Sequence, residues 1–223
     1  MTNSIQHETV RILKHQATII KRPQDDNCSP YHWNLIFDLA LILRDKEYLN
    51  LLLQIPIWDI HPLPFFHAAY AKLRYYIHTQ KFDQAEKQYE IVTQKSESNE
   101  TIFHGIEGKK IVQAEGLSKQ MKLLNLPLVK LYQLILKKEG DQFNLLLEKY
   151  LISKKKWIKK NKEDGNSKYW IDRPLLSICS FAHDQGLNIT VESDYIPAFL
   201  YRKEFDVEEV LKMDFLGEDG EVS

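Results

Sequence analysis

Cys179 and His183 are the first residues of this sequence that could do chemistry together. They stand four positions apart in the apolar stretch LLSICSFAHD, so a helix there places both on one face. A thiolate beside an imidazole is the arrangement that activates a cysteine nucleophile. Leu175, Leu176 and Ala182 lie nearby, however, and a small cysteine among such residues is typical of a buried helix face. We therefore expect a core cysteine here and not a catalytic one.

Phosphate and metal sites are indicated no more strongly. The pair Gly108-Lys109 is followed by Lys110, and Gly105 comes too soon before it, so the stretch fails the phosphate-loop pattern GxxxxGK[ST]. His61, His67 and His104 are scattered, without cysteine or carboxylate partners at zinc-ligand spacing. The sequence therefore predicts no enzyme, no metal site and no cofactor.

Charge is patterned in two segments of opposite sign. Between Ile152 and Lys168 there are seven lysines against Glu163 and Asp164, interleaved with Trp157. Such a run could grip phosphates and stack bases, or it could be a solvated helix end with lysines favoured by the helix dipole. From Lys203 to Ser223 there are eight acidic side chains and two lysines. That tail could be solvated and frayed, or it could mate with a basic partner.

Composition is that of an ordinary globular chain of 223 residues, with 43% hydrophobic residues and a net charge of −1. Two cysteines, Cys28 and Cys179, fit a reducing cytoplasm and make a structural disulfide unlikely. The start MTNSIQHETV shows no secretory signal pattern, and no run of about 18 apolar residues could span a bilayer. We expect a cytoplasmic protein without a membrane partner, and the oligomeric state stays open.

Helical spacing of apolar residues dominates the chain and predicts an all-α fold. It is a bundle of roughly eight to ten helices in one domain over residues 1–223, with one short extended segment near the C-terminus. The helix of residues 30–45 is apolar nearly all round and is expected to be central and buried. Pro127 is expected to begin a helix, Gly140 to end it, and Asp141 and Asp172 to cap the two helices that follow. The predicted helices cover residues 4–22, 30–45, 46–54, 65–80, 81–94, 110–125, 126–140, 142–160, 172–186 and a short stretch from 198.

Residues 65–94 predict a helical hairpin, with a capping box formed by Asp83 and Glu86. The pair resembles a single tetratricopeptide-type unit, but no second copy follows at a spacing of about 34 residues. An ordinary helical hairpin is the simpler interpretation. A helical adaptor for other proteins remains an alternative function for the chain.

The C-terminal third carries an ordered series of residues across two helices and the stretch GLNITVESDYIPAFL. In that stretch Gly186 permits a positive φ, Ile189 and Val191 alternate toward one side, and Pro197 fits the first turn of a short helix. The segment is expected to close the open side of the bundle, with direct contact to a partner as the alternative. The full series is Asp141, Phe143, Asn144, Trp157, Ala182, Asp184, Gly186, Ser193, Tyr195 and Pro197.

This series resembles immunity protein family 49 of bacterial polymorphic toxin systems, most clearly over residues 139–202. The resemblance implies a helical, non-catalytic protein that binds and neutralises a cognate toxin, such as one delivered by type VI secretion. Many toxins of these systems are nucleases with basic clefts. Charge complementarity then makes four acidic residues of the tail the expected toxin contacts, with nucleic-acid binding by Lys154–Lys168 as a weaker alternative. These contacts are Glu204, Asp206, Glu208 and Glu209.

Overall fold

Helices form the body of the protein, as the sequence predicts. The computed structural model describes residues 6–12, 15–21, 30–55, 65–97, 102–104, 110–112, 121–163, 165–166 and 169–206. A π-helical turn, η3 (Met121–Asn125), directly precedes the helix that begins at Leu126. The α-helices are α1 (Pro30–Leu43), α2 (Lys46–Leu53), α3 (Phe65–His78), α4 (Phe82–Glu97), α6 (Leu126–Leu136), α7 (Gly140–Lys160), α8 (Arg173–Asp184) and α9 (Ala198–Tyr201).

Two short antiparallel hairpins replace helices that the sequence predicts. The expected helix of residues 4–22 is wrong, because β1 (Gln6–Ile12) pairs there with β2 (His15–Lys21), Gln6 opposite Lys21. Both strands are rich in Val, Ile and Thr, whose branched side chains favour extended backbone. The expected helix of residues 110–125 is also wrong at its start, where β4 (Lys110–Val112) pairs with β3 (Ile102–His104).

Helix ends follow the predicted chemistry only in part. The Asp172 side chain accepts a hydrogen bond from the Leu175 amide and caps α8, as expected. Asp141 and Asp83 lie inside the first turns of α7 and α4, so neither is a cap. Gly140 begins α7 instead of ending α6, and the left-handed residue after α6 is Lys138, with φ of 57°. A lysine can adopt the left-handed conformation at a modest energetic cost, so Gly140 does not mark the residue that ends α6.

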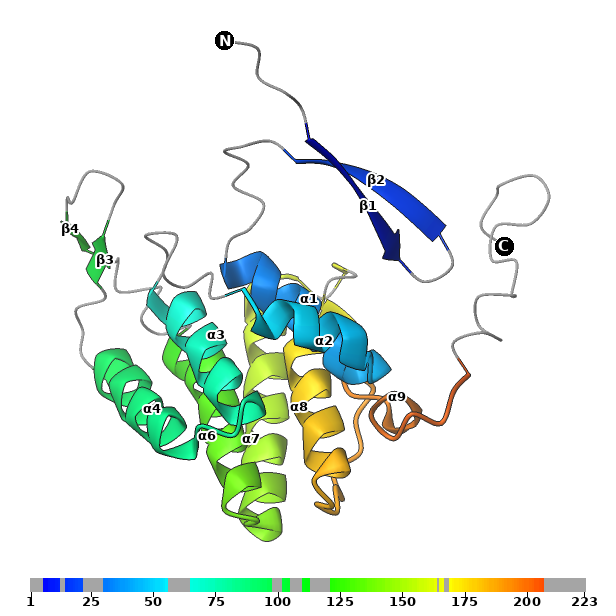
Figure 1. Ribbon diagram of the computed structural model, residues 1–223. Coiled ribbons are helices and arrows are strands. Elements are labelled where there is room, and N and C mark those ends of the chain that lie inside the picture. The colour runs from blue at the N-terminus through cyan, green and yellow to red at the C-terminus, as the bar shows by residue number, and fades with distance from the viewer. Residues whose placement is uncertain are drawn as a thin grey trace.

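Helix α6 lies at the centre of the body and packs against α4, α7 and α8 (Figure 1). Val129, Leu131, Tyr132 and Ile135 of α6 are fully buried. The helices α3 and α4 pack side by side as the predicted hairpin, and α1 lies across α8 and α3. The bundle therefore places α7 and α8, which carry most of the C-terminal residue series, beside a rigid central helix.

Helix α1 is amphipathic in the structure, although its sequence is apolar nearly all round. Trp33 and Phe37 are buried, and the Trp33 indole donates a hydrogen bond to the Leu52 carbonyl of α2 at 3.1 Å. Ile36 and Leu39, on the other side, are exposed. The expectation of a helix that is buried all round is therefore wrong, because α2, α3 and α8 pack against α1 and leave Ile36 and Leu39 at the surface.

A buried ion pair joins α1 to α3 in the middle of the bundle. The Nη2 atom of Arg74, whose side chain is fully buried, lies 2.7 Å from Oδ1 of Asp38. The same guanidinium donates to the Tyr132 hydroxyl of α6 at 3.1 Å and to the Ser177 hydroxyl of α8 at 3.4 Å. Ser177 in turn donates to Asp38 at 2.7 Å. One charged group is thus bonded to three other helices.

Aromatic rings complete the surroundings of this guanidinium. Its central carbon lies 4.2 Å from the centroid of the Phe37 ring and 5.1 Å from that of Tyr70. Burial favours loss of the charge, but Asp38 together with Tyr132 and Tyr70 outweighs burial, so the pKa of Arg74 lies above its ordinary value. Burial, and then the Arg74 charge, lower the pKa of His78 to about 3. The imidazole is therefore neutral at pH 7 and packs as a ring against Phe181, 4.6 Å between centroids.

Replacing Asp38 with alanine should destabilise the protein by about 3–5 kcal/mol, because it leaves the Arg74 charge buried without its partner. Urea unfolding followed by circular dichroism measures the change. Glu90→Ala, on the exposed side of α4, is the matched control and should leave the unfolding midpoint unchanged. Equal midpoints for the two variants would show that the ion pair does not hold the bundle together.

Candidate functional site

The predicted pairing of Cys179 with His183 does not make a nucleophile. The Cys179 thiol is fully buried, and burial raises its pKa well above the ordinary value. His183 is exposed at the end of α8, with its Nδ1 atom 3.7 Å from Asp184. Cysteine chemistry needs a thiolate, and this environment keeps the thiol protonated. The interpretation of Cys179 as a core residue agrees with this burial.

The predicted histidines are not brought together in the part of the chain that the structure describes. His61 lies outside it, and the described residues contain no group of three metal-ligating side chains. The ring of His67 lies against Tyr31, with centroids 5.5 Å apart, and burial lowers its pKa. His67 therefore packs as an aromatic ring and not as a ligand.

Asn144 holds the extended segment against α7. Its amide nitrogen donates to the Asn188 carbonyl at 2.9 Å, and its amide oxygen accepts from the Thr190 amide at 2.9 Å. A side-chain amide thus takes the place that a neighbouring strand would take in a sheet. Leu187 and Ile189 are buried while Asn188 and Thr190 are exposed, which is the alternation of an extended chain. The segment closes the bundle side as the sequence predicts.

Asp184 anchors the end of α8 to the corner between α1 and α2. Arg44 donates from Nε to Oδ2 of Asp184 at 3.0 Å and from Nη2 to Oδ1 at 2.9 Å. The same guanidinium also donates to the backbone carbonyls of Ile42 and Tyr201. Gly186 then turns the chain with φ of 81°, as expected. Asp184 and Gly186 therefore position the chain that follows α8.

A second buried ion pair fixes the start of α8. Nζ of Lys154 on α7 lies 2.5 Å from Oδ2 of Asp172, and both side chains are buried. The Asp172 amide donates to the Tyr195 carbonyl at 2.8 Å, so the same residue also ties down the far end of the extended segment. The Ser193 hydroxyl accepts from the Tyr195 amide at 3.2 Å and shapes the turn there. Pro197 follows as the cap residue of α9, one position before the place the sequence predicts.

The remaining residues of the series serve packing. Phe143 and Ala182 are fully buried in the main core. Trp157 is half-buried and meets the Tyr169 ring edge-on, with centroids 5.8 Å apart. Asp141 is exposed in the first turn of α7, where a negative charge favours the helix dipole. None of these four is placed to do chemistry.

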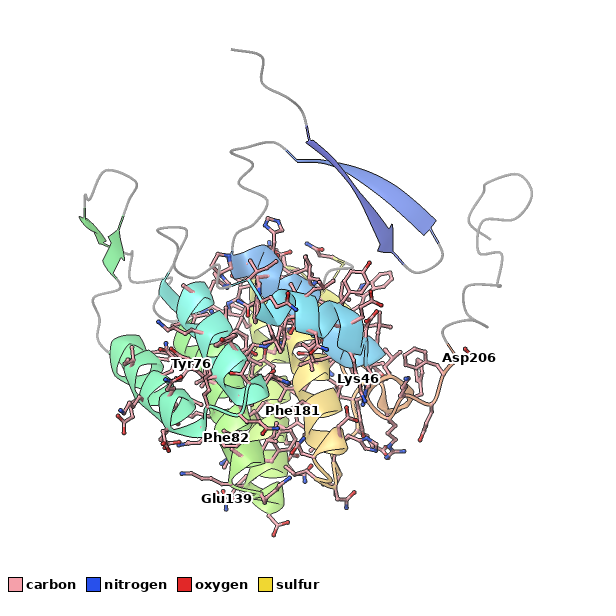
Figure 2. All side chains as sticks on the ribbon, in the orientation of Figure 1. Lys46, Tyr76, Phe82, Glu139, Phe181 and Asp206 are labelled. Atoms are coloured by element: carbon pink, nitrogen blue, oxygen red, sulfur yellow. The ribbon has the colours of Figure 1, made fainter. Side chains whose placement is uncertain are left out.

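The predicted acidic contacts lie after α9. Glu204 and Asp206 are exposed, and Glu204 is 3.8 Å from the guanidinium of Arg202. Figure 2 shows Asp206 projecting from the edge of the helical body, on the side away from Phe82 and Glu139. Glu208 and Glu209 lie outside the described residues. Glu204 and Asp206 therefore lie at the surface of the part of the chain that the structure describes.

An open groove of about 940 Å³ runs between α7 and the extended segment, and we call it the α7 groove. One wall is a single face of α7, formed by Glu148, Leu151, Ile152 and Lys155. The other wall is residues 190–195, and Trp170 lines the same groove. Trp170 is 64% exposed, more than any other large hydrophobic residue that the structure describes.

The comparison with protein families decides what kind of protein this is. The family model of immunity protein 49 matches residues 2–200, which is most of the chain. The chain belongs to the immunity protein 49 family. No curated protein and no solved structure matches it.

In this member of the immunity protein 49 family, the residue series is mainly structural. Asn144, Asp184 and Ser193 all hold backbone or a distant helix in place. No sequence pattern pointed to the partners Arg44 and Lys154, because ion pairs between distant segments leave no local pattern. The exposure of Trp170 was also missed, since a tryptophan beside lysines can equally be buried. None of the described helices is long and apolar enough to cross a membrane.

Replacing Asn144 with alanine should free the extended segment of this immunity protein. The loss of the two hydrogen bonds from Asn144 to the segment is expected to cost about 1–2 kcal/mol and to speed hydrogen exchange at the Thr190 amide. Exchange monitored by mass spectrometry or NMR measures this directly. Gln142→Ala, at an exposed position of the same helix, should leave the exchange at Thr190 as it is. Unchanged exchange in both variants would contradict the role assigned to Asn144.

Proposed function

We propose that this chain is an immunity protein that binds a cognate antibacterial toxin and blocks it, protecting the cell that makes both. The family match over residues 2–200 carries this proposal. Such a protein acts by covering or distorting the toxin, so it needs a preformed complementary surface and no reaction chemistry of its own. The burial of Cys179, the one cysteine among the residues that the structure describes, is compatible with a non-catalytic role.

The proposed partner is a toxin of a polymorphic toxin system, of the kind delivered between bacteria by type VI secretion, and it is met in the cytoplasm. A nuclease with a basic cleft suits the acidic residues after α9. Glu204 and Asp206 are exposed there, and Glu208 and Glu209 follow in the sequence. These four carboxylates are proposed to steer the toxin toward the immunity protein.

Two observations favour this function over the alternatives. Lys154 is buried against Asp172, so the basic run of α7 offers fewer free cations to nucleic acid than its sequence indicates. The α3–α4 hairpin presents Ala85 and Val92 of α4 to the main core, with α4 packed on α6. The apolar side of this hairpin is thus already used by the bundle, which leaves little of it for an adaptor.

Titration calorimetry tests the proposal directly. The full chain should bind the catalytically disabled C-terminal domain of the toxin encoded beside it at 1:1, with nanomolar or tighter affinity. Immunity proteins must hold a lethal partner through slow dissociation, which requires such affinity. No binding at micromolar concentrations, with both proteins folded, would refute the proposed function for this pair.

Replacing Glu204, Asp206, Glu208 and Glu209 together with alanine should slow association with the toxin by about tenfold at low salt and flatten its salt dependence. Stopped-flow or surface-plasmon kinetics over a salt series measures both effects. The matched control removes four exposed acidic residues elsewhere on the body. They are Asp83, Glu86 and Glu90 of α4, and Glu139, which Figure 2 labels on the side away from Asp206. If both variants associate at the same rate, the four carboxylates have no specific role.

A further inference from the structure

Apolar side chains form part of the lining of the α7 groove. Ile152 and Trp170 are exposed to solvent, and Leu151 and Val191 line the same groove. An exposed tryptophan in a groove is the type of residue that dominates binding energy at protein interfaces. It is also costly to leave in water, so a partner that covers it gains the burial of a large aromatic surface.

Charges at the groove are unbalanced. Glu148, Glu192 and Asp194 contribute three carboxylates to the lining, against the single ammonium of Lys155. Among the described residues none of these four side chains is held in an ion pair, whereas Lys154, on the buried side of α7, is neutralised by Asp172. The open carboxylates therefore favour a cationic partner and repel phosphates.

Both walls of the groove are fixed before any partner arrives. Asn144 bonds the extended segment at Asn188 and Thr190, and the Asp172 amide bonds it again at Tyr195. The groove wall of residues 190–195 thus lies between two anchors. A surface that is already ordered loses little conformational entropy when it binds.

We propose that the α7 groove is the surface that grips the toxin, and that its occupant is a toxin segment presenting arginine or lysine side chains. A guanidinium or ammonium over the Trp170 ring gains a cation–π contact, and the groove carboxylates neutralise its charge. The inference rests on the proposed function and deepens it, because it assigns the central contact to Trp170, Glu192 and Asp194. The acidic residues after α9 then act in steering and not in the grip.

Two groove variants test this assignment by calorimetry against the disabled toxin domain. Trp170→Ala should weaken binding about thirtyfold or more, the loss typical of an interface hot spot. Glu192→Lys combined with Asp194→Lys should weaken it at least as much, with the largest loss at low salt. Trp170, Glu192 and Asp194 are all exposed, and none of them belongs to the hydrogen bonds that anchor the segment. Circular dichroism and the melting temperature should therefore stay as in the wild type.

The matched controls lie on α4, away from the groove. Phe82→Ala removes another exposed aromatic ring, and Asp83→Lys with Glu90→Lys makes an equal change of charge. Both should bind the toxin as the wild type does. Hydrogen exchange of the wild-type complex supplies an independent readout, with protection expected over residues 148–155 and 190–195.

The outcomes of these experiments distinguish the groove assignment from the proposed immunity function. Tight binding by the wild type and by both groove variants, without protection of the groove, would overturn the groove assignment and leave the immunity function standing. No binding by the wild type would overturn both. Self-association of the free chain that Trp170→Ala abolishes would assign the groove to a second copy of this chain, and so would also overturn the proposal.

Discussion

The charge of Arg74 is the constraint on which the helical body depends. A guanidinium that is fully buried must find partners for its N–H groups, and it finds them on α1, α6 and α8 at once. A change in the relative position of any of these helices would break a hydrogen bond to a charged group that is buried from solvent. Apolar packing alone tolerates small slips between helices, whereas this network does not. The hydrogen bonds of Arg74 therefore fix α1, α3, α6 and α8 relative to one another, and α7 packs against α6.

The C-terminal residue series extends the same principle to the surface. Two polar members are bonded to residues far away in the sequence, Asn144 to the extended segment and Asp184 to Arg44, and Asp172, just before α8, is paired with Lys154 in the same way. These bonds hold a stretch of chain that has no sheet or helix to stabilise it. In this chain these residues build a frame around the extended segment.

Under the proposed function, the α7 groove and the acidic residues after α9 divide recognition of the toxin into two physical tasks. Exposed carboxylates on Glu204 and Asp206 act through a field that extends about 10 Å and fades with salt. Trp170 acts only on contact, through burial and ring geometry. Long-range attraction governs how fast partners meet, and the contact governs how slowly they part. The proposed inhibition of a toxin would benefit from both.

The sequence by itself determined the helical class, the α3–α4 hairpin, the cap at Asp172, the turn at Gly186 and the family. These rest on local periodicity, on side chains that bond their own backbone, and on the order of residues along the chain. Only the tertiary structure decided that α1 is buried on one side, that residues 6–21 form a hairpin, and that Lys154 is buried while Trp170 is exposed. The partners of Arg74, Arg44 and Asn144 also came from the fold alone. Such pairings depend on which helices pack together, and packing between distant segments leaves no periodic trace in a single sequence.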